Sequence, residues 1–585
     1  MLNKFIIFFS LSCALSYGQL SIRNDAYIFI TDEIVFVEDD INLNESDSKI
    51  YLRDEAQIIQ GSGTTGNSGV GELSVYQEAN VGAYEYNYWC SPIGSKTNNL
   101  VNNPFGISLL NDVIDLTNST PATYIHSSSY NGTSTPLNIE PFWIWKYIAG
   151  STYADWVHVQ GNTTINPGEG FTMKGTQGSG DAQRFDFRGK PNNGTLAVDV
   201  SNNAFTLVGN PYPSAMDALA YIHDPDNAAV ITGTLYYWEQ DPNVNSHYLA
   251  DYQAGYATYI IDASGTVETT LPATFNTYNG DGSINTGGVG TGSKLPKRYI
   301  PIGQGFMVEG TATGTVKAKN SHRVFVKETN VDSEFFKTTN SKTQKAASTS
   351  SGFSIVPSDY KRFRLNIDFN NTYTRQIAQT FHISATEGFD YGLETKINAS
   401  DVLKSDAHWI IGVDSYTAGA LTFDESLKIP LAIKVAKNMP VRIRIADVQN
   451  FENASSIYIH DTKNDTYVDL NNQDFNINLE AGNYSNRFEV TFTKNTLSND
   501  FEEFKTLKVY HNNSTLTLNN PKAINIHVLE LIDVTGKRVL HKKIQSTETT
   551  QNYSTKGLSD GVYIVNILLE NDQAFTKKII VSTKK

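Results

Sequence analysis

The sequence predicts an all-β protein made of consecutive antiparallel β-sandwich or β-repeat domains. Tyr and Phe number 31 and 29 against 5 Met and 2 Cys, and aromatic side chains suit the half-buried face of a pleated sheet. Short apolar or alternating runs recur between turns rich in Asn, Asp and Gly, and 3.6-residue periodicity is nearly absent. With 585 residues, the chain has room for roughly four folded units.

Composition excludes two broad classes of protein. Hydrophobic residues make up 39% of the chain, which is enough to build cores and argues against wholesale disorder. The net charge of −15 repels phosphate backbones, so we expect no nucleic-acid partner.

Residues 1–18 have the features of a secretory signal peptide. Lys4 supplies the positive charge, Phe5–Leu11 the apolar stretch, and Ser16-Tyr17-Gly18 a small-x-small site for cleavage before Gln19. The apolar stretch is shorter than the ~20 residues that span a bilayer. We therefore expect export of the mature chain.

The two cysteines affect the expected form of the exported chain. Lipid attachment at Cys13 is an alternative to simple cleavage, although Ser10-Leu11-Ser12 is a poor lipobox. Cleavage would leave Cys90 alone, so the mature domains would be held by packing without an intrachain disulfide.

An internal repeat lies in the first half of the chain. The frame GxGFxxxGT occurs at 168–176 and again at 303–311, and a strand ending in a Pro turn precedes each copy, at 88–92 and at 207–211. A nucleotide-binding fingerprint needs a third glycine that opens a helix, whereas β-type residues follow here. We interpret the glycines as a turn or bulge that lets the Phe enter the core.

Polar stretches and changes of pattern give the domain boundaries. One short helix is expected around Ala215–His223, where Ser214 and Asp217 form a capping-box pattern. After a polar linker, alternating runs such as Phe363–Phe369 and Phe488–Phe492 predict a sandwich. The predicted organisation is a signal peptide at 1–18, a short β region at 19–80, β repeats at 81–200 and 201–330, a linker at 331–352, a β-sandwich at 353–495 and a C-terminal module at 506–585.

The C-terminal module is basic and follows an acidic body. Between Thr506 and Lys585 there are 11 Lys or Arg and 6 acidic residues, giving +5 for the module and −20 for the rest. Its predicted strands and turns make a small Ig-like sandwich. Three motifs occur in order: Leu531–Val539 with Asp533 and Gly536, Leu558–Val565 with Gly561 and Tyr563, and Phe575–Val581 with Lys577 and Lys578.

These three motifs resemble the type A sorting domain of type IX secretion in Bacteroidetes. The resemblance covers about 80 residues, and Asn520-Pro521 is similar to a shortened form of the family's Pro-Asn-Pro element. It implies export through the periplasm and then through an outer-membrane translocon that recognises the domain. It further implies a sortase that removes the domain and attaches the passenger to the cell surface or releases it. The expected location is the outer cell surface or the medium.

No catalytic motif is found in the body of the chain. GxSxG, HExxH and CxxC are absent from residues 19–505, and the histidines are scattered. Two carboxylates gathered from distant strands would suffice for glycoside hydrolysis, and sequence spacing does not exclude them. We expect no cofactor except a structural Ca²⁺, for which Glu38-Asp39-Asp40 and Asp224-Pro225-Asp226-Asn227 offer oxygen ligands.

Aromatic runs provide the candidate ligand platform, formed by Trp143, Trp145 and Trp238. Alternation along a strand would place Trp143 and Trp145 on one face. An open face would offer a stacking surface for a sugar ring, and a closed face, which we favour, would be core.

Two hypotheses follow. The favoured one is a noncatalytic secreted or cell-surface protein that binds glycans or adheres to surface polymers. The alternative is a secreted, glycan-active hydrolase, which requires a cleft with two carboxylates about 5 to 10 Å apart.

Overall fold

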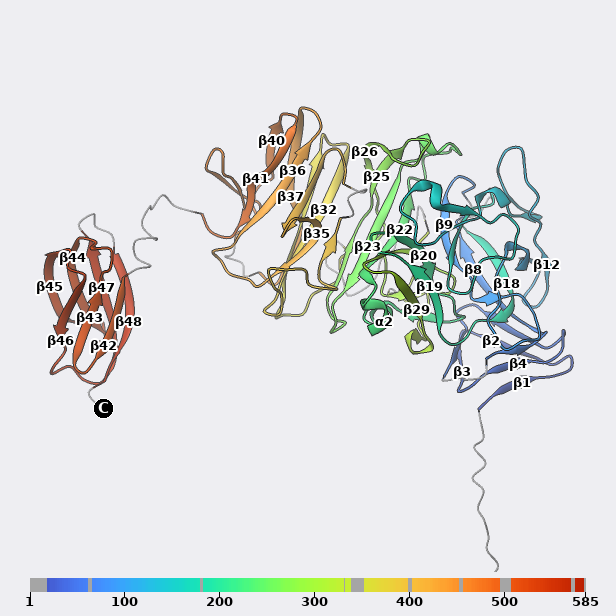
Figure 1. The fold of residues 1–585 in the computed structure, drawn as a ribbon, viewed down its shortest axis with the longest axis horizontal. Coiled ribbons are helices and arrows are strands. Elements are labelled where there is room, and N and C mark those ends of the chain that lie inside the picture. The colour runs from blue at the N-terminus through green and yellow to red at the C-terminus, as the bar shows by residue number, and fades with distance from the viewer. Residues whose placement is uncertain are drawn as a thin grey trace, which may run out of the picture. The chain divides into compact units, whose positions relative to one another are not determined.

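The computed structural model describes residues 18–61, 66–80, 82–178, 182–330, 332–337, 352–397, 402–451, 456–494, 507–569 and 574–582. The predicted signal peptide lies outside these residues except for Gly18, and so does most of the predicted linker. The chain divides into two compact units, Met1–Thr493 and Lys494–Lys585. The regular secondary structure of both is nearly all strand, which confirms the predicted all-β fold class (Figure 1).

The N-terminal strands stack in parallel ladders. β1 (Leu20–Ile22), β4 (Ile41–Leu43) and β7 (Ser68–Gly69) form one ladder, and β3 (Ile34–Val37) pairs with β6 (Gln57–Gln60) in another. The third ladder joins β2 (Tyr27–Thr31), β5 (Lys49–Arg53) and β8 (Glu72–Ala79). Apolar side chains such as Ile30, Leu52 and Val75 lie in register and are buried, so the core forms a column inside the stack.

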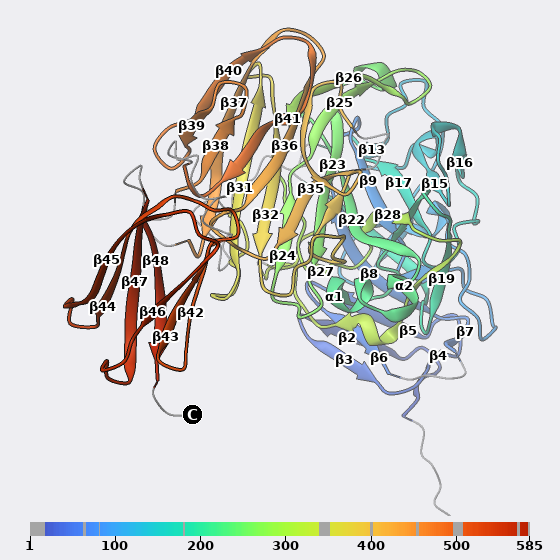
Figure 2. The same ribbon diagram turned by 60° about the vertical axis from the view of Figure 1, so that its left-hand side comes forward.

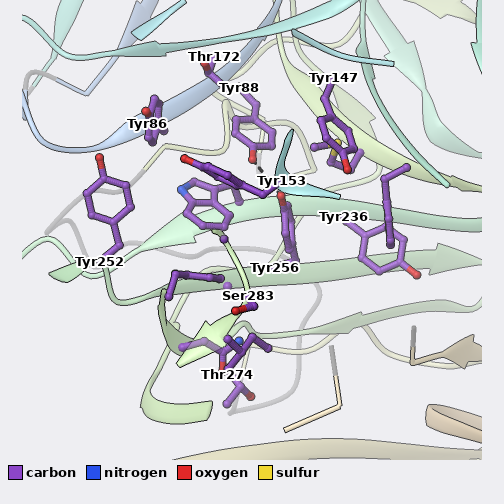
Figure 3. A pocket seen from close by; sticks show the side chains of 18 of the residues that line it. Tyr86, Tyr88, Tyr147, Tyr153, Thr172, Tyr236, Tyr252, Tyr256, Thr274 and Ser283 are labelled. Atoms are coloured by element: carbon purple, nitrogen blue, oxygen red, sulfur yellow. Dashed lines mark hydrogen bonds between the residues drawn. The ribbon is translucent and has the colours of Figure 1, made fainter. Parts of the chain in front are cut away.

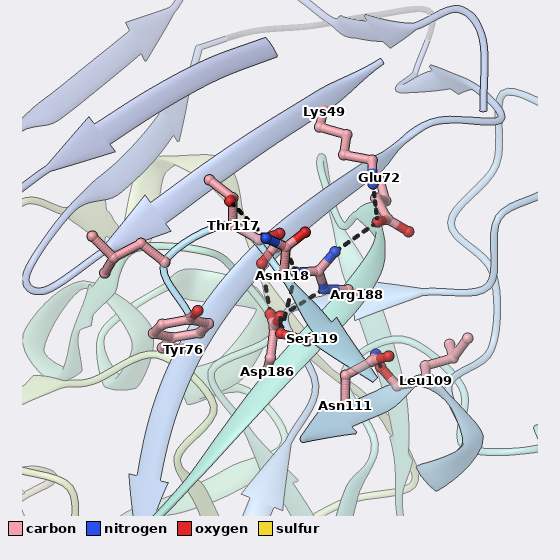
Figure 4. Close-up of polar contacts among 12 residues, drawn as sticks. Lys49, Glu72, Tyr76, Leu109, Asn111, Thr117, Asn118, Ser119, Asp186 and Arg188 are labelled. Carbon is pink, nitrogen blue, oxygen red and sulfur yellow. Dashed lines mark hydrogen bonds and ion pairs between the residues drawn. The ribbon is translucent and has the colours of Figure 1, made fainter. Parts of the chain in front are cut away.

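β8 passes from this stack into an antiparallel sheet. It pairs with β18 (Gln183–Pro191), which continues to β11 (Leu110–Val113) and β12 (Ser119–Pro121). A buried polar network ties these strands together (Figure 4). The Asp186 carboxylate accepts hydrogen bonds of 2.6 Å each from Ser74, Ser119 and Arg188, and Arg188 also binds Glu72 at 3.1 Å. The two hydroxyl hydrogen bonds and the ion pair with Arg188 compensate the charge of Asp186, so its carboxylate can be completely buried.

The two glycine frames begin equivalent strands. β17 (Gly170–Lys174) pairs with β9 (Tyr86–Cys90), placing Gly170 opposite Cys90, and β28 (Gly305–Gly310) pairs with β20 (Phe205–Gly209), placing Gly305 opposite Gly209. Phe171 and Phe306 are fully buried. A Cβ on Gly305 would lie 2.7 Å from the Trp89 backbone nitrogen, and one on Gly170 would lie 2.8 Å from the Val208 carbonyl oxygen. The glycines therefore allow the two strand pairs to approach each other closely.

β28 and β20 belong to a second antiparallel sheet. Its order is β20, β28, β22 (Ile231–Gln240), β23 (Ala254–Ile261), β25 (Thr274–Tyr278) and β26 (Ile284–Thr291), with β24 (Glu268–Leu271) also paired to β23. β19 (Leu196–Val200) pairs separately with β29 (Gly314–Ala318).

The predicted helix is shorter than expected. α1 spans Ala218–Ile222, and α2 (Pro225–Ala228) follows it. Ser214 does not cap α1, because Ala215–Asp217 forms the strand β21 and the Asp217 carboxylate accepts the capping hydrogen bond from the Leu219 amide at 3.0 Å. The capping residue predicted from sequence was therefore wrong by three positions.

Residues 361–491 form an 11-stranded sheet around one large core. Its strands are β31 (Lys361–Phe369), β32 (Tyr373–Phe381), β33 (Thr395–Lys396), β34 (Asp406–Ile411), β35 (Asp414–Leu421), β36 (Lys428–Val435), β37 (Met439–Gln449), β38 (Tyr458–Asp461), β39 (Thr466–Asp469), β40 (Phe475–Leu479) and β41 (Gly482–Thr491). Two fully buried arginines of β31 join this sheet to β24. Arg362 donates to the Glu268 carbonyl oxygen at 2.8 Å, and Arg364 donates to the Thr270 carbonyl oxygen at 2.6 Å. These bonds join the two sheets, whose strands β24 and β32 lie side by side in Figure 2.

The second unit is a sandwich of two antiparallel sheets. One contains β42 (Lys508–Asn512), β43 (Thr515–Asn519) and β46 (Thr550–Ser554). The other has the order β45 (Arg538–Ser546), β44 (Ile526–Asp533), β47 (Gly561–Leu569) and β48 (Ala574–Val581). Leu516, Leu518, Leu529, Val565 and Ile567 of the two sheets share one buried core.

Candidate functional site

A cavity of about 870 Å³ lies between the glycine-framed strands, the β22–β26 sheet and strands β32, β33 and β35 of the 11-stranded sheet. Its volume is at the upper end of the range for ligand sites, about 300–1,000 Å³. Many aromatic rings converge on it (Figure 3). The aromatic lining residues are Tyr86, Tyr88, Phe142, Trp143, Trp145, Tyr147, Tyr153, Trp156, Phe205, Tyr236, Trp238, Tyr252, Tyr256 and Tyr278.

The structure brings all three predicted platform residues to this cavity. Trp143 ends the 3₁₀ turn Pro141–Trp143, and Trp145 begins β15 (Trp145–Tyr147), so strand alternation does not relate them and that premise was wrong. Trp143 is 6% exposed, whereas Trp145 and Trp238 are half-buried. The rings thus form the wall of a cavity rather than a flat outer surface or a closed core.

Ring contacts and hydrogen bonds fix the orientation of these walls. Trp143 stacks on His247 with ring centroids 4.9 Å apart, and its Nε1 donates to the Tyr130 carbonyl oxygen at 2.7 Å. Trp238 lies nearly parallel to Tyr88, with an interplanar angle of 9° and centroids 6.1 Å apart. The Tyr88 and Tyr256 hydroxyls share a hydrogen bond of 2.9 Å.

Most residues of the cavity were not predicted from the sequence. Tyr86 and Tyr88 alternate along β9, and Tyr236 and Trp238 alternate along β22, so each pair faces one side. Alternation alone could have nominated these pairs. It could not show that Tyr252 and Tyr256, from β23 and the turn before it, complete the wall.

A buried lysine lies directly behind the wall. Lys174 Nζ is 3.8 Å from the ring centroid of Trp143, 4.6 Å from that of Tyr86 and 4.8 Å from that of Tyr252. It donates to the Tyr252 hydroxyl at 2.6 Å and to His247 Nδ1 at 3.2 Å. Burial lowers the pKa of Lys174 to about 6.

His247, the histidine bonded to Lys174, is neutral near pH 7. Burial, together with the charge of Lys174, lowers the pKa of His247 to about 4. Its Nε2 lies 2.6 Å from the Asn131 side-chain oxygen, so Nε2 carries the proton and Nδ1 accepts from Lys174.

The polar lining of the cavity contains no carboxylate in the part of the chain that the structure describes. Among the described residues, its wall contains neither Asp nor Glu. The paired acids of a glycoside hydrolase are therefore missing at this site, since such acids must flank the bond that is cleaved.

Three of the acidic side chains considered for calcium are engaged with other groups. Asp224 pairs with Lys319 at 2.7 Å and with His322 at 3.0 Å, and Asp226 pairs with Lys319 at 2.7 Å. Asp40 accepts from the Asn193 amide at 3.1 Å. In the described part of the chain, no three His, Cys, Asp or Glu side chains are placed to hold a metal ion together.

The sorting-motif residues occupy turns and an edge strand of the second unit. Asp533 accepts hydrogen bonds from the amides of Thr535 and Lys537, and Gly536 has a φ of 84°, so both define the turn between β44 and β45. Hydrogen bonding by Thr535 lowers the pKa of Asp533. Lys577 and Lys578 are exposed on β48, which is an edge of its sheet.

The second sorting motif covers the end of a turn and the start of a strand. Asp560-Gly561 in the sequence favours a turn whose backbone suits glycine, but Gly561 begins β47 and does not have a positive φ, whereas Gly557 has a φ of 90°. The glycine with the left-handed backbone is therefore Gly557. Tyr563 is buried, and its hydroxyl donates to the Ser559 carbonyl oxygen at 3.0 Å, closing the turn before β47.

The C-terminal residues match a known protein family, and this match defines the class of the protein. Residues 509–582 match the secretion system C-terminal sorting domain, so the chain is a type IX secretion sorting-domain protein, exported to the cell surface or the extracellular space. Residues 116–492, more than half of the chain, match a domain of unknown function, DUF8693. The chain belongs to this family.

Comparisons with individual proteins add little. No curated protein matches the chain. Among solved structures, a DUF3244 family protein from Bacteroides vulgatus with an immunoglobulin-like β-sandwich fold is 18% identical, covering 13% of this chain and 84% of its own, with a TM-score of 0.12. Tp47, the 47-kilodalton lipoprotein of Treponema pallidum, is 9% identical over 60% of this chain and 86% of its own, with a TM-score of 0.11. The BSP domain of a biofilm associated protein is 10% identical over 75% and 87%, with a TM-score of 0.11. All three TM-scores are far below 0.5 and support no conclusion about this chain.

One further finding concerns membranes. Within the described ranges, none of the helices has the length and hydropathy that a membrane-spanning helix needs.

Proposed function

We propose that the chain is a noncatalytic cell-surface or secreted protein that binds a glycan in the aromatic cavity. The observation that supports this proposal is the combination of many aromatic faces with a wall free of carboxylates among the described residues. Aromatic rings stack on the apolar faces of sugar rings, and tyrosine hydroxyls add hydrogen bonds at the ring edges. The hydrolase hypothesis receives no support at this cavity.

Removal of single rings tests this proposal. We expect Trp145→Ala and Trp238→Ala, each in the mature full chain, to weaken binding to a responsive polysaccharide roughly tenfold, the loss of about 1.4 kcal/mol expected for one stacking ring. Tyr27→Ala is the matched control, because Tyr27 is 61% exposed on β2 and does not line the cavity. Affinity electrophoresis in polysaccharide-containing gels measures the effect. Equal losses in all three variants would contradict the cavity as the binding site.

We further propose that the second unit meets the type IX translocon and a sortase, which removes it and either attaches or releases the passenger. Support comes from the match over residues 509–582 and from the two turns and the lysine-bearing edge strand described above. Deletion of residues 507–585 should abolish appearance of the chain outside the cell, as measured by blotting of surface and medium fractions. Normal export of the truncated chain would contradict the proposal.

A further inference from the structure

We propose that the ligand of the aromatic cavity is an uncharged glycan, and neither an acidic polysaccharide nor a hydrocarbon. This inference rests on the proposed function and specifies the ligand class at the same site. Its evidence is the polar chemistry of the wall rather than the rings themselves.

Three buried polar atoms of wall residues have no hydrogen-bond partner among the described residues. They are Nε1 of Trp238, the hydroxyl of Thr258 and the side-chain oxygen of Gln376. In the β22–β23 pairing, Trp238 lies opposite Tyr256 and Tyr236 lies opposite Thr258, so these side chains share one face of the sheet. That face lines the cavity.

A ligand whose hydroxyl groups reach these three atoms would satisfy them. A sugar hydroxyl accepts from an indole N–H, donates to an amide oxygen, and either donates to or accepts from a threonine hydroxyl. A hydrocarbon would leave all three atoms buried and unsatisfied, which is costly. The wall thus favours a hydroxylated ligand over an apolar one.

The cations of the wall already have anionic partners. Arg375 makes two hydrogen bonds to Asp406, at 2.7 and 3.0 Å, and Lys396 pairs with Asp414 at 2.9 Å. His247, the third basic residue of the wall, is engaged with Asn131 and Lys174. A uronate or sulfate would therefore have to compete with Asp406 and Asp414 for Arg375 and Lys396, which weakens the binding of an anion.

Two further observations also disfavour an anionic ligand. Lys174, behind the wall, is enclosed by rings and bonded to Tyr252 and His247, and its pKa of about 6 leaves it mostly neutral at pH 7. The chain outside the C-terminal module carries a net charge of −20, which repels polyanions over longer distances.

The test is isothermal titration of the mature full chain with two sets of polysaccharides and one apolar probe. The neutral set is a β-glucan, a mannan and soluble starch, the acidic set is alginate, polygalacturonate and heparin, and the probe is a fluorescent fatty acid. We expect at least one neutral polysaccharide to bind ten or more times more tightly than every acidic one. Acidic polysaccharides that bind as well or better would overturn the inference but leave the proposed function standing. If no polysaccharide binds, or if the fatty acid alone binds, the proposed function fails as well.

Two variants check the cause of the preference. Asp414→Asn frees Lys396, and we expect it to raise the affinity for alginate several-fold; an unchanged affinity would contradict the role of ion pairing in excluding anions. Trp238→Phe keeps an aromatic ring but removes Nε1, and we expect a several-fold loss of affinity for the neutral polysaccharide. Wild-type affinity in this variant would contradict recognition through the unpartnered donor.

Discussion

The two glycine-framed strand pairs have the same backbone register but different side chains toward the cavity. β9 and β17 contribute Tyr86, Tyr88 and Thr172, whereas β20 and β28 contribute Phe205 and Met307. The first pair therefore presents hydroxyl-bearing groups to a ligand, and the second presents apolar ones.

The difference extends to one buried charged position. Lys174 on β17 corresponds to Glu309 on β28 in the GxGFxxxGT frame, and both are buried, at 4% and 5% exposure. Lys174 binds Tyr252 and His247, and Glu309 accepts from the Tyr236 hydroxyl at 3.3 Å. Close backbone approach restricts the frame glycines, whereas the side chains on the cavity face are free to differ.

The largest expected effect follows from breaking the shared frame. Gly305→Ala would place a Cβ 2.7 Å from the backbone nitrogen of Trp89, and Gly170→Ala would place one 2.8 Å from the Val208 carbonyl oxygen. Since backbone atoms cannot move aside cheaply, we expect each variant to lose more than about 3 kcal/mol of unfolding free energy. Urea denaturation followed by tryptophan fluorescence measures the loss.

A matched glycine provides the control for this experiment. An added Cβ at Gly280, in the turn after β25, meets no heavy atom within 4 Å, so Gly280→Ala should change stability by less than about 0.5 kcal/mol. Wild-type stability of Gly305→Ala would show that the two strand pairs do not need their close contact.

The next effect distinguishes the buried lysine from the buried glutamate. Because burial lowers the pKa of Lys174 to about 6, the unfolded chain binds more protons than the folded chain between about pH 6 and the ordinary lysine pKa near 10. Wild-type stability should therefore rise with pH across this window. We expect Lys174→Met to flatten that rise. Near pH 6 the unfolding free energy of the variant should exceed that of the wild type by a few kcal/mol. The lost hydrogen bonds of Tyr252 and His247 to Lys174 reduce this gain.

Unfolding midpoints measured from pH 6 to pH 10 check this expectation. Glu309→Gln serves as the comparison at the equivalent position, because its amide can still accept from Tyr236, and we expect it to retain the rise with pH. Identical pH profiles for wild type and Lys174→Met would refute the assignment of Lys174 as a destabilising buried amine.

The smallest expected effect concerns the hydrogen bond between the Tyr88 and Tyr256 hydroxyls on the cavity face. Tyr88→Phe removes the hydroxyl bonded to Tyr256, with an expected cost of about 1 kcal/mol. Tyr88→Phe combined with Tyr256→Phe should cost less than the sum of the single changes, because both ends of one bond are lost together. Additive costs in this double-mutant cycle would mean that the two hydroxyls are not coupled.

The sequence predicted the fold class because strand and turn chemistry is local. Alternating runs such as Phe363–Phe369 became the expected strand β31, and the turn at Asp533–Gly536 formed as its residues require. The parallel stacking of β2 on β5 was less accessible, because their residues are mostly apolar and the runs are too short to reveal the partner strand.

The cavity was only partly predictable, for a different reason. Trp143, Trp145 and Trp238 were nominated by their chemistry, but periodicity does not show what covers an aromatic face. The wall is completed by residues more than a hundred positions away, including Arg375 and Lys396 of the 11-stranded sheet. Similarly, the capping of α1 by Asp217 depends on β21, whose pairing with β27 (Tyr299–Ile300) and β30 (Arg323–Val324) is not local.

The two buried arginines of β31 have a consequence for proteolysis. Arg362 and Arg364 extend into the preceding sheet and end on carbonyl oxygens of β24, where water is excluded. Cleavage of the chain within residues 338–351 would cut a covalent connection without releasing these guanidinium groups. The two fragments should therefore elute together from a sizing column and separate only in denaturant, so a nicked molecule at the cell exterior would keep its cavity intact.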